Sequence, residues 1–255
     1  MRGMEGRAAL VTGGAGGIGA ATGLRMAQDG FNVALLDLNE DSATSTAEKI
    51  ADAVPGRKVI GVGCDVSDAA SVADAVAKVQ SDLGGLHIAV NNAGVTRDNL
   101  IHKMTEDDWD TVIAVHLRGC FLVCRAVQAP MVANGWGRIV NISSINAHGA
   151  RGQANYSAAK MGIQGLTRTL AIELGPKGIT VNCVAPGFVQ TPMTDATAVR
   201  LKMEISAFHE MIAKDTPARR VGKPEDIAHV ISLLVSDDAD FVTGQTVNVD
   251  GGLRL

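Results

Sequence analysis

The chain has 255 residues, of which 46% are hydrophobic and 20% charged, and its formal net charge is −4. A chain of this length can bury a sizeable core, and the absence of a basic excess argues against nucleic acid or an anionic membrane as a partner. We therefore expect a globular protein that acts on a small molecule.

The amino-terminal stretch "MRGMEGRAALVTGGAGGIG" passes from charged residues to a short apolar run that ends in glycines. It has neither the h-region of a signal peptide nor the length of a membrane span. The four cysteines, Cys64, Cys120, Cys124 and Cys183, show no disulfide framework. These features predict a cytoplasmic protein with buried thiols and no metal site, because no histidine pair accompanies Cys120 and Cys124.

Short apolar runs alternate along the chain with longer segments rich in Ala and Leu. This alternation predicts repeated βα units, hence a parallel sheet with helices on both faces, in a single domain over residues 1–255. The expected strands lie within residues 8–14, 32–37, 58–66, 87–94, 138–144, 179–187 and 246–252.

The region at about 188–222 interrupts this rhythm with an extra helical segment. An insertion after a late strand lies near the carboxyl ends of the strands, where open α/β sheets bind ligands. We interpret it as a substrate lid, the alternative being a peripheral helical hairpin. Five of its apolar side chains are candidates for an acyl channel or for ordinary core: Met193, Met203, Ile205, Phe208 and Met211.

The stretch "TGGAGGIG" (12–19) follows the first expected strand and begins the first expected helix. Gly13, Gly17 and Gly19, with Ile18 between the last two, leave room for a tight turn and for close approach of a pyrophosphate to a helix N-terminus. Asp37 ends the second expected strand, where a carboxylate would bind the ribose hydroxyls of a dinucleotide. The pattern predicts a dinucleotide site.

The charges near this turn favour NAD(H) over NADP(H). No Lys or Arg lies between Arg7 and Arg25 or between Arg25 and Lys49. A 2′-phosphate would therefore meet Asp37 without an obvious cationic partner. A basic residue from a distant loop or a neighbouring subunit would reverse this preference.

The only tyrosine of the chain, Tyr156, precedes Lys160 by four residues within "QANYSAAK". If this stretch is helical, both side chains lie on one face, and the ammonium can lower the pKa of a phenol that is ordinarily about 10. Ser143 ends an expected strand 13 residues before Tyr156 and could hold a substrate oxygen. The combination predicts hydride transfer between nicotinamide and a carbonyl, with Tyr156 exchanging the proton.

Over essentially its whole length the sequence resembles the short-chain dehydrogenase/reductase family. The matching motifs are "TGGAGGIG" (12–19), "CDV" (64–66), "NNAG" (91–94), Ser143, the YxxxK pattern of Tyr156 and Lys160, and "PG" followed by Thr191. The resemblance implies a Rossmann fold with a seven-stranded sheet and commonly a homotetramer. It also implies further cofactor contacts from Asp65, Val66, Asn91, Ala93, Gly94, Pro186, Gly187, Val189 and Thr191.

One position departs from the family pattern. Where the family usually has an asparagine in a VNLxG-like stretch that completes a proton relay from the lysine, this chain has "VHLRG" with His116. Neutral His116 could anchor the relay water or transfer protons itself; alternatively it is a packed helix residue bonded to backbone. We include it among the catalytic candidates.

Within the family, "GQANYSAAK" (152–160), "VAPGFVQTPMT" (184–194) and "TGQTVNVDGG" (243–252) resemble 3-oxoacyl-thioester reductases. We expect a thioester of coenzyme A or of an acyl carrier protein, although Arg138 and Lys177 are the only candidate contacts for an acidic carrier. The alternatives are a sugar, polyol or small-ketone dehydrogenase and, outside catalysis, a dinucleotide-binding regulator. Retention of Ser143, Tyr156 and Lys160 argues against the regulator.

Overall fold

A computed structural model describes residues 5–254 of the chain. Its strands form one sheet in the order β3-β2-β1-β4-β5-β6-β7, and every pairing in it is parallel. The predicted α/β fold with a seven-stranded doubly wound sheet is therefore confirmed. The strands are β1 (Ala8–Thr12), β2 (Asn32–Asp37), β3 (Val59–Gly63), β4 (Ile88–Asn91), β5 (Gly137–Ile142), β6 (Ile179–Pro186) and β7 (Thr246–Val249).

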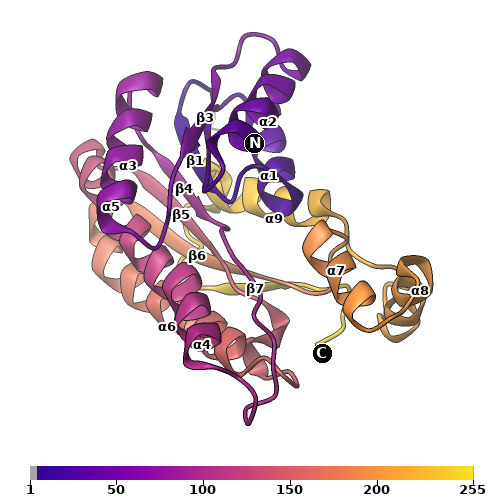
Figure 1. The fold of residues 1–255 in the computed structure, drawn as a ribbon. Helices are drawn as coiled ribbons and strands as arrows, with labels where there is room; N and C mark the ends of the chain where they lie inside the picture. The colour runs from indigo at the N-terminus through magenta and orange to yellow at the C-terminus, as the bar shows by residue number, and fades with distance from the viewer. Residues whose placement is uncertain (1–4, 255) are drawn as a thin grey trace.

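Helices cover both faces of the sheet (Figure 1). One layer contains α1 (Gly17–Gln28), α2 (Glu40–Ala53) and α9 (Pro224–Val235). The opposite layer contains α3 (Ala69–Leu83), α4 (Glu106–Val112), α5 (Gly119–Asn134) and α6 (Ala154–Leu174). Short 3-10 turns at η2 (Ile145–His148), η3 (Gly175–Lys177) and η4 (Asp237–Ala239) complete the connections.

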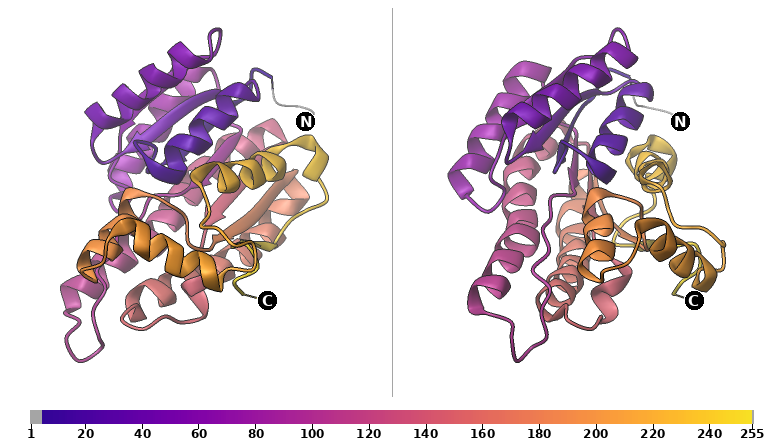
Figure 2. Two further views of the ribbon diagram at one scale, coloured as in Figure 1. Left: turned by 90° about the vertical axis from the view of Figure 1, so that its right-hand side faces the viewer. Right: turned by 45° about the vertical axis from the view of Figure 1, so that its right-hand side comes forward.

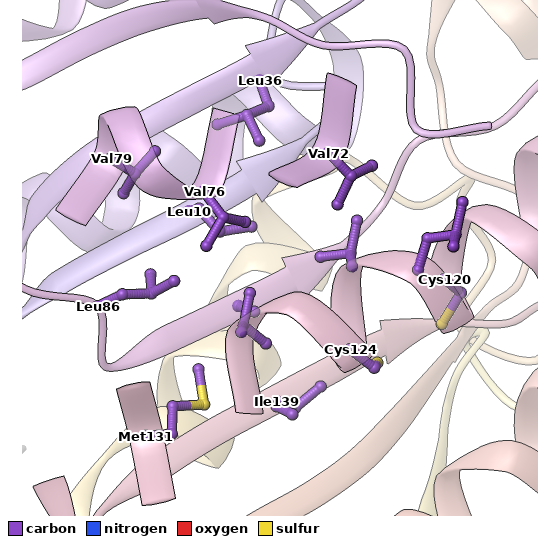
Figure 3. Packing of buried hydrophobic residues seen from close by; sticks show 14 of the residues in the cluster. Leu10, Leu36, Val72, Val76, Val79, Leu86, Cys120, Cys124, Met131 and Ile139 are labelled. Carbon is purple, nitrogen blue, oxygen red and sulfur yellow. The ribbon is translucent and has the colours of Figure 1, made fainter. Parts of the chain in front are cut away.

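The sheet is buried on both faces because its strands carry apolar side chains in almost continuous runs. All residues of β1 and β6 are buried. Figure 3 shows one of the two resulting core layers, in which Leu10 and Ile139 of the sheet lie near Val76 of α3 and Cys124 of α5. All four cysteines are free and buried.

Side chains at the helix N-termini fix where several helices begin. Asn39 accepts a hydrogen bond from the Ser42 backbone N–H at 2.9 Å at the start of α2. Asp68 does the same for Ser71 at 3.0 Å at the start of α3. Such caps satisfy backbone donors that a helix cannot satisfy itself.

Helices α4 and α5 are joined without a break by a π-helical segment, η1 (Ile113–Arg118), which the sequence pattern did not predict. The whole run Glu106–Asn134 is long and apolar enough, by length and composition alone, to cross a membrane. Here Leu122, Val127 and Met131 lie buried in the core beside the sheet. A core helix of a folded domain meets the same criterion.

The irregular region predicted at 188–222 contains two helices, α7 (Pro192–Arg200) and α8 (Ile205–Asp215). They stand away from the body of the sheet, as the orange helices of Figure 2 show. α8 is held by Phe208, which is buried and packs edge-on against Phe188 with ring centroids 5.1 Å apart. The extra helical segment is thus a helical pair beyond the end of β6.

Candidate active site

A cavity of about 370 Å³ lies at the carboxyl ends of the central strands, where the strand order reverses between β1 and β4. Open α/β sheets bind ligands at this point. Most predicted site residues line it: Gly13, Gly17, Ile18, Asp37, Gly94, His116, Ser143, Tyr156, Lys160, Pro186, Gly187, Val189 and Thr191. Sequence reasoning missed Gly16, Asn92, Ile142, Ser144, Pro192 and Thr194, which also line it.

The glycine-rich turn between β1 and α1 has no room for a side chain at Gly13 or Gly19. Gly13 has a φ of +63°, and a Cβ there would lie 2.9 Å from the Ala93 Cα. A Cβ on Gly19 would overlap the Gly13 carbonyl oxygen. The Asn92 amide fastens the turn by donating to the Thr12 carbonyl at 3.0 Å and to the Gly13 carbonyl at 3.1 Å. Gly19 therefore serves the packing of the turn and does not itself line the cavity.

The N-terminus of α1 faces this cavity without a capping side chain. Its N-cap is Gly16, no described side chain bonds to the first-turn N–H groups, and the first turn holds no acidic residue. A Cβ on Gly16 would meet nothing within 4 Å. Open donors at a positive helix end are the chemistry that binds a phosphate or pyrophosphate, so these residues fit a dinucleotide.

Asp37 ends β2 beside the same cavity. Its carboxylate accepts a hydrogen bond from the Ala15 backbone N–H at 3.1 Å, which ties it to the glycine-rich turn. Leu38, the next residue, is 77% exposed and carries no charge. Among the described residues that line the cavity, Lys160 is the only lysine or arginine. Asp37 is also the only acidic residue among them.

Two adjacent serines follow β5, and their hydroxyls face different partners. Ser143 donates to the Lys160 carbonyl at 2.8 Å and accepts from the Gln164 amide at 3.1 Å, so its hydroxyl bonds to helix α6. The Ser144 hydroxyl accepts from the Asn146 backbone N–H at 3.1 Å and lies close enough to the Tyr156 phenol to lower its pKa. The spacing of 13 residues pointed to Ser143, whose hydroxyl bonds to helix α6, whereas Ser144 is the serine that acts on the phenol.

Helix α6 places Tyr156 and Lys160 on one face, as predicted. The Lys160 ammonium nitrogen lies 5.4 Å from the centroid of the Tyr156 ring and donates to the Ile142 carbonyl at 2.6 Å. Burial lowers the pKa of Lys160 to about 8, with partial compensation from the Cys183 and Cys120 thiols. The lysine is therefore mostly charged near neutral pH.

The Tyr156 side chain is half-buried, and part of it faces the cavity. Burial raises its pKa to about 12, the Ser144 hydrogen bond opposes this rise and the charge of Asp98 adds to it. The sequence predicted a pKa lowered by Lys160 and a bound nicotinamide. In the protein alone desolvation is the larger effect, so Tyr156 holds its proton at neutral pH.

His116 is buried in the π-helical segment beneath the site. Its Nε2 lies 3.0 Å from the Val95 nitrogen and 2.8 Å from the Val95 oxygen, and its ring stands edge-on to Tyr156 with centroids 5.2 Å apart. Burial and the charge of Lys160 lower the pKa of His116 to about 3. The imidazole is therefore neutral at physiological pH and is bonded to the backbone. His116 does not carry a positive charge beside Lys160.

A second, small cavity of about 10 Å³ lies between His116, Asn91 and Lys160. This volume is near the lower limit for one water molecule. Asn91 Oδ1 and His116 Nδ1 are buried and have no hydrogen-bond partner among residues 5–254. Val66, Ala93 and Cys120 are among the other residues that line the same cavity.

The remaining predicted residues are placed around the cofactor end of the sheet. The Asp65 carboxylate accepts from the Ser67 backbone N–H at 2.9 Å and from its hydroxyl at 2.7 Å, which orders the turn after β3. Asn91 donates to Asn141 at 2.8 Å. Asp65, Val66, Asn91 and Ala93 do not line the large cavity. Their direct contact with a cofactor stays a prediction.

Of the lid side chains proposed for an acyl channel, Met193 alone lines the large cavity. Phe208 is buried against Phe188, and Ile205 and Met211 are partly exposed on α8. Of the five side chains considered for an acyl channel, only Met193, in the first turn of α7, therefore lies at the cavity.

Comparison with known proteins gives one family across the chain. A family model described as "Enoyl-(Acyl carrier protein) reductase" matches residues 13–254. The short-chain reductase protein NovJ of Streptomyces niveus is 44% identical over 244 residues, which cover 96% of this chain and 92% of the relative. The (2S)-[(R)-hydroxy(phenyl)methyl]succinyl-CoA dehydrogenase subunit BbsD of Thauera aromatica is 41% identical over 253 residues, covering 99% and 98%.

The 3-oxoacyl-[acyl-carrier-protein] reductase FabG of Thermotoga maritima is 42% identical over 253 residues, covering 99% of each chain. Among solved structures, levodione reductase superposes with a TM-score of 0.94 at 34% identity over 98% of each chain. NAD⁺-bound xylitol dehydrogenase superposes with a TM-score of 0.92 at 30% identity, over 98% of this chain and 100% of the other.

Proposed function

The chain belongs to the short-chain dehydrogenase/reductase family of oxidoreductases, and from that membership we propose that it is an NAD(H)-dependent reductase of 3-oxoacyl thioesters, or 3-hydroxyacyl dehydrogenase in reverse. One observation carries the proposal. Ser144, Tyr156 and Lys160 line one cavity with the uncapped N-terminus of α1. A proton donor, a hydroxyl to orient an oxygen and an anion cradle for the cofactor thus meet in one place.

The nicotinamide, when bound, supplies the hydride to the carbonyl carbon or takes it back from the alcohol. In the reducing direction Tyr156 donates its proton to the carbonyl oxygen, and its raised pKa keeps that proton available. Ser144, which lines the cavity beside Tyr156, donates to the same oxygen and orients it. This role was predicted for Ser143, whose hydroxyl is instead engaged with Lys160 and Gln164.

Lys160 supplies positive charge beneath the phenol and resupplies the proton. We infer that a water in the small cavity between Asn91, His116 and Lys160 connects this lysine to the Asn91 and His116 side chains. His116 then anchors the relay water and does not carry protons itself, because its pKa of about 3 keeps it neutral. The substitution of the family asparagine is thereby compatible with activity.

The preference for NAD(H) rests on Asp37. Its carboxylate is held toward the cavity by the Ala15 N–H, and the adjoining Leu38 offers no cation to a 2′-phosphate. Glu40 and Asp41 in the first turn of α2 add negative charge nearby. Repulsion of a 2′-phosphate by these groups favours the ribose with free hydroxyls.

The similarity to FabG and BbsD supports a thioester substrate. The name of FabG states an acyl-carrier-protein substrate, and that of BbsD states a CoA substrate. Arg138, a candidate contact for an acidic carrier, is buried and stacks on Trp136 with its guanidinium carbon 4.2 Å from the ring centroid. Only Lys177 of the two candidates is exposed. Coenzyme A is therefore the carrier we propose first.

A polyol or small-ketone substrate is the second candidate, supported by the similarity to xylitol dehydrogenase and levodione reductase. A parallel panel distinguishes the candidates: acetoacetyl-CoA, an acetoacetyl carrier protein, xylitol and a simple diketone, each with NADH or NAD⁺. We expect kcat/KM for acetoacetyl-CoA to exceed that for the others. Xylitol or diketone turnover above thioester turnover would replace the thioester proposal, and NADH binding without any turnover would support the regulator.

We further propose a homotetramer in the cytoplasm. Exposed apolar side chains on α5, on α6 and after η4, namely Phe121, Ile172 and Phe241, give surface that assembly would bury. The four free buried thiols suit a reducing compartment. Light scattering of the purified protein measures the number of subunits directly.

A further inference from the structure

Asp98 lies in the loop after β4 and joins three separate segments at the rim of the site. Its Oδ2 accepts from the Arg200 guanidinium at 2.8 Å and from the Gln153 amide at 3.0 Å. Arg200 is the last residue of lid helix α7, and Gln153 is the N-cap of α6. One carboxylate oxygen therefore connects the lid to the start of the helix that carries Tyr156.

The environment of Asp98 is unusual for an ion pair at a rim. Its side chain is only 11% exposed, whereas that of Arg200 is 49% exposed. The second carboxylate oxygen, Oδ1, is buried and has no hydrogen-bond partner among residues 5–254. A buried carboxylate with one unsatisfied oxygen depends strongly on the few cations that reach it, and Arg200 is the one that the lid supplies.

Asp98 is also fixed close to the proton donor. The neighbouring Arg97 carbonyl accepts from the Asn155 amide at 2.9 Å, and Asn155 directly precedes Tyr156. The negative charge of Asp98 acts on the phenol and raises its pKa, in addition to the larger effect of burial. An unpaired Asp98 thus holds the proton on Tyr156 more firmly than an Asp98 neutralised by Arg200.

We propose that the Asp98–Arg200 pair couples the position of lid helix α7 to the proton affinity of Tyr156. With the lid closed, Arg200 compensates the carboxylate and the phenol can release its proton. When α7 moves away, the uncompensated carboxylate favours the protonated phenol. Asp98 and Arg200 are positioning residues in this account, which rests on the proposed role of Tyr156.

Other charged groups face the same region and remain unchanged by the test. Lys160 lies beneath the phenol, and His116 beside it is neutral. Arg97 and Arg151 are exposed on the two loops of the rim, and no ion pair to either is formed within residues 5–254. Arg200 is therefore the cation whose distance from Asp98 depends on the lid.

The test measures the pH dependence of kcat for oxidation of 3-hydroxybutyryl-CoA with saturating NAD⁺, since Tyr156 must then act as a base. Asp98→Asn removes the negative charge, and Arg200→Gln leaves it unpaired. We expect the midpoint of the rising limb to fall by roughly half a pH unit in Asp98→Asn and to rise by a similar amount in Arg200→Gln. The double variant should return close to the wild-type midpoint.

Opposite shifts separate this coupling from a structural role, because both single variants break the same contact and a loosened lid would change both in one direction. Arg220→Gln is the matched control: it breaks another ion pair, to Asp226 at 2.8 Å, on an exposed segment after the lid helices. Equal or same-direction shifts in the two single variants would overturn the proposal. Wild-type activity that persists in Tyr156→Phe would instead overturn the proposed function on which it rests.

Discussion

The contrast between Ser143 and Ser144 offers the sharpest test of the site geometry. Ser144 lies close enough to the Tyr156 phenol to lower its pKa, and both residues line the large cavity. Removing a preorganised donor to a developing oxyanion typically costs about 10²- to 10³-fold in kcat. We therefore expect Ser144→Ala to lower kcat by roughly that factor, with a modest loss of thermal stability because its hydroxyl accepts from the Asn146 N–H at the start of η2.

Ser143→Ala should show the reverse pattern. The Ser143 hydroxyl is buried and bonds to the Lys160 carbonyl and the Gln164 amide. Its loss leaves the buried Gln164 donor without this acceptor, which costs about 1–3 kcal/mol of folding free energy. For a domain of this size that corresponds to a fall in Tm of roughly 2–12 °C. kcat should fall by less than about tenfold, since the hydroxyl is engaged with helix α6.

The assay compares both variants with wild type in steady-state reduction of acetoacetyl-CoA by NADH and in thermal melting followed by circular dichroism. Thr167→Val is a control for the loss of a buried hydroxyl on α6 away from the cavity, where Thr167 bonds to Asn141 at 2.9 Å. A large kcat loss in Ser143→Ala together with near-normal turnover in Ser144→Ala would refute the assignment and restore the spacing-based one.

Three further outcomes follow from the same structure. Asp37→Asn should raise the ratio of kcat/KM with NADPH to that with NADH about tenfold by removing like-charge repulsion, and adding Leu38→Arg should raise it further; an unchanged ratio would contradict the role of Asp37. Two glycine variants can be compared by differential scanning fluorimetry with NADH titration. Gly19→Ala should unfold at a lower temperature because its Cβ would overlap the Gly13 carbonyl. Gly16→Ala should keep its Tm, because its Cβ points into open space, but should bind NADH roughly tenfold more weakly. His116 has a pKa of about 3 in the folded protein against an ordinary 6.5, so below pH 6.5 the unfolded chain binds a proton that the folded chain does not. As the pH drops below 6.5, the free energy of urea unfolding should therefore fall by about 1.4 kcal/mol per pH unit more in wild type than in His116→Asn. Parallel slopes in the two proteins would contradict a buried neutral imidazole.

The fold was predictable from sequence because its strands are buried on both faces and thus appear as nearly unbroken apolar runs. β2 matches the predicted range 32–37, and the other strands lie largely within theirs. The π-helical segment at Ile113–Arg118 was not predicted, because one extra residue in a helical turn leaves the apolar pattern almost unchanged. The lid was recognised as helical, but its division into α7 and α8 depends on packing of Phe208 that the sequence pattern does not specify.

The positions of the candidate site residues were predictable where spacing along one element determines geometry. Tyr156 and Lys160 share a helix face because they are four residues apart, and Gly13 and Gly19 in the turn at 12–19 leave no room for a side chain. Spacing does not distinguish adjacent residues that differ only in direction, as with Ser143 and Ser144. It also missed Asp98, whose partners Gln153 and Arg200 are distant in sequence and meet it only through tertiary packing.

The most direct test of the central claim follows nicotinamide absorbance while the purified protein meets acetoacetyl-CoA, with NADH and NADPH in parallel and Tyr156→Phe beside wild type. The account predicts turnover that prefers NADH and falls at least about 10³-fold in Tyr156→Phe, because the phenol is the proton donor in the cavity. Turnover that survives Tyr156→Phe, in a variant that melts like wild type and binds NADH normally, would contradict it.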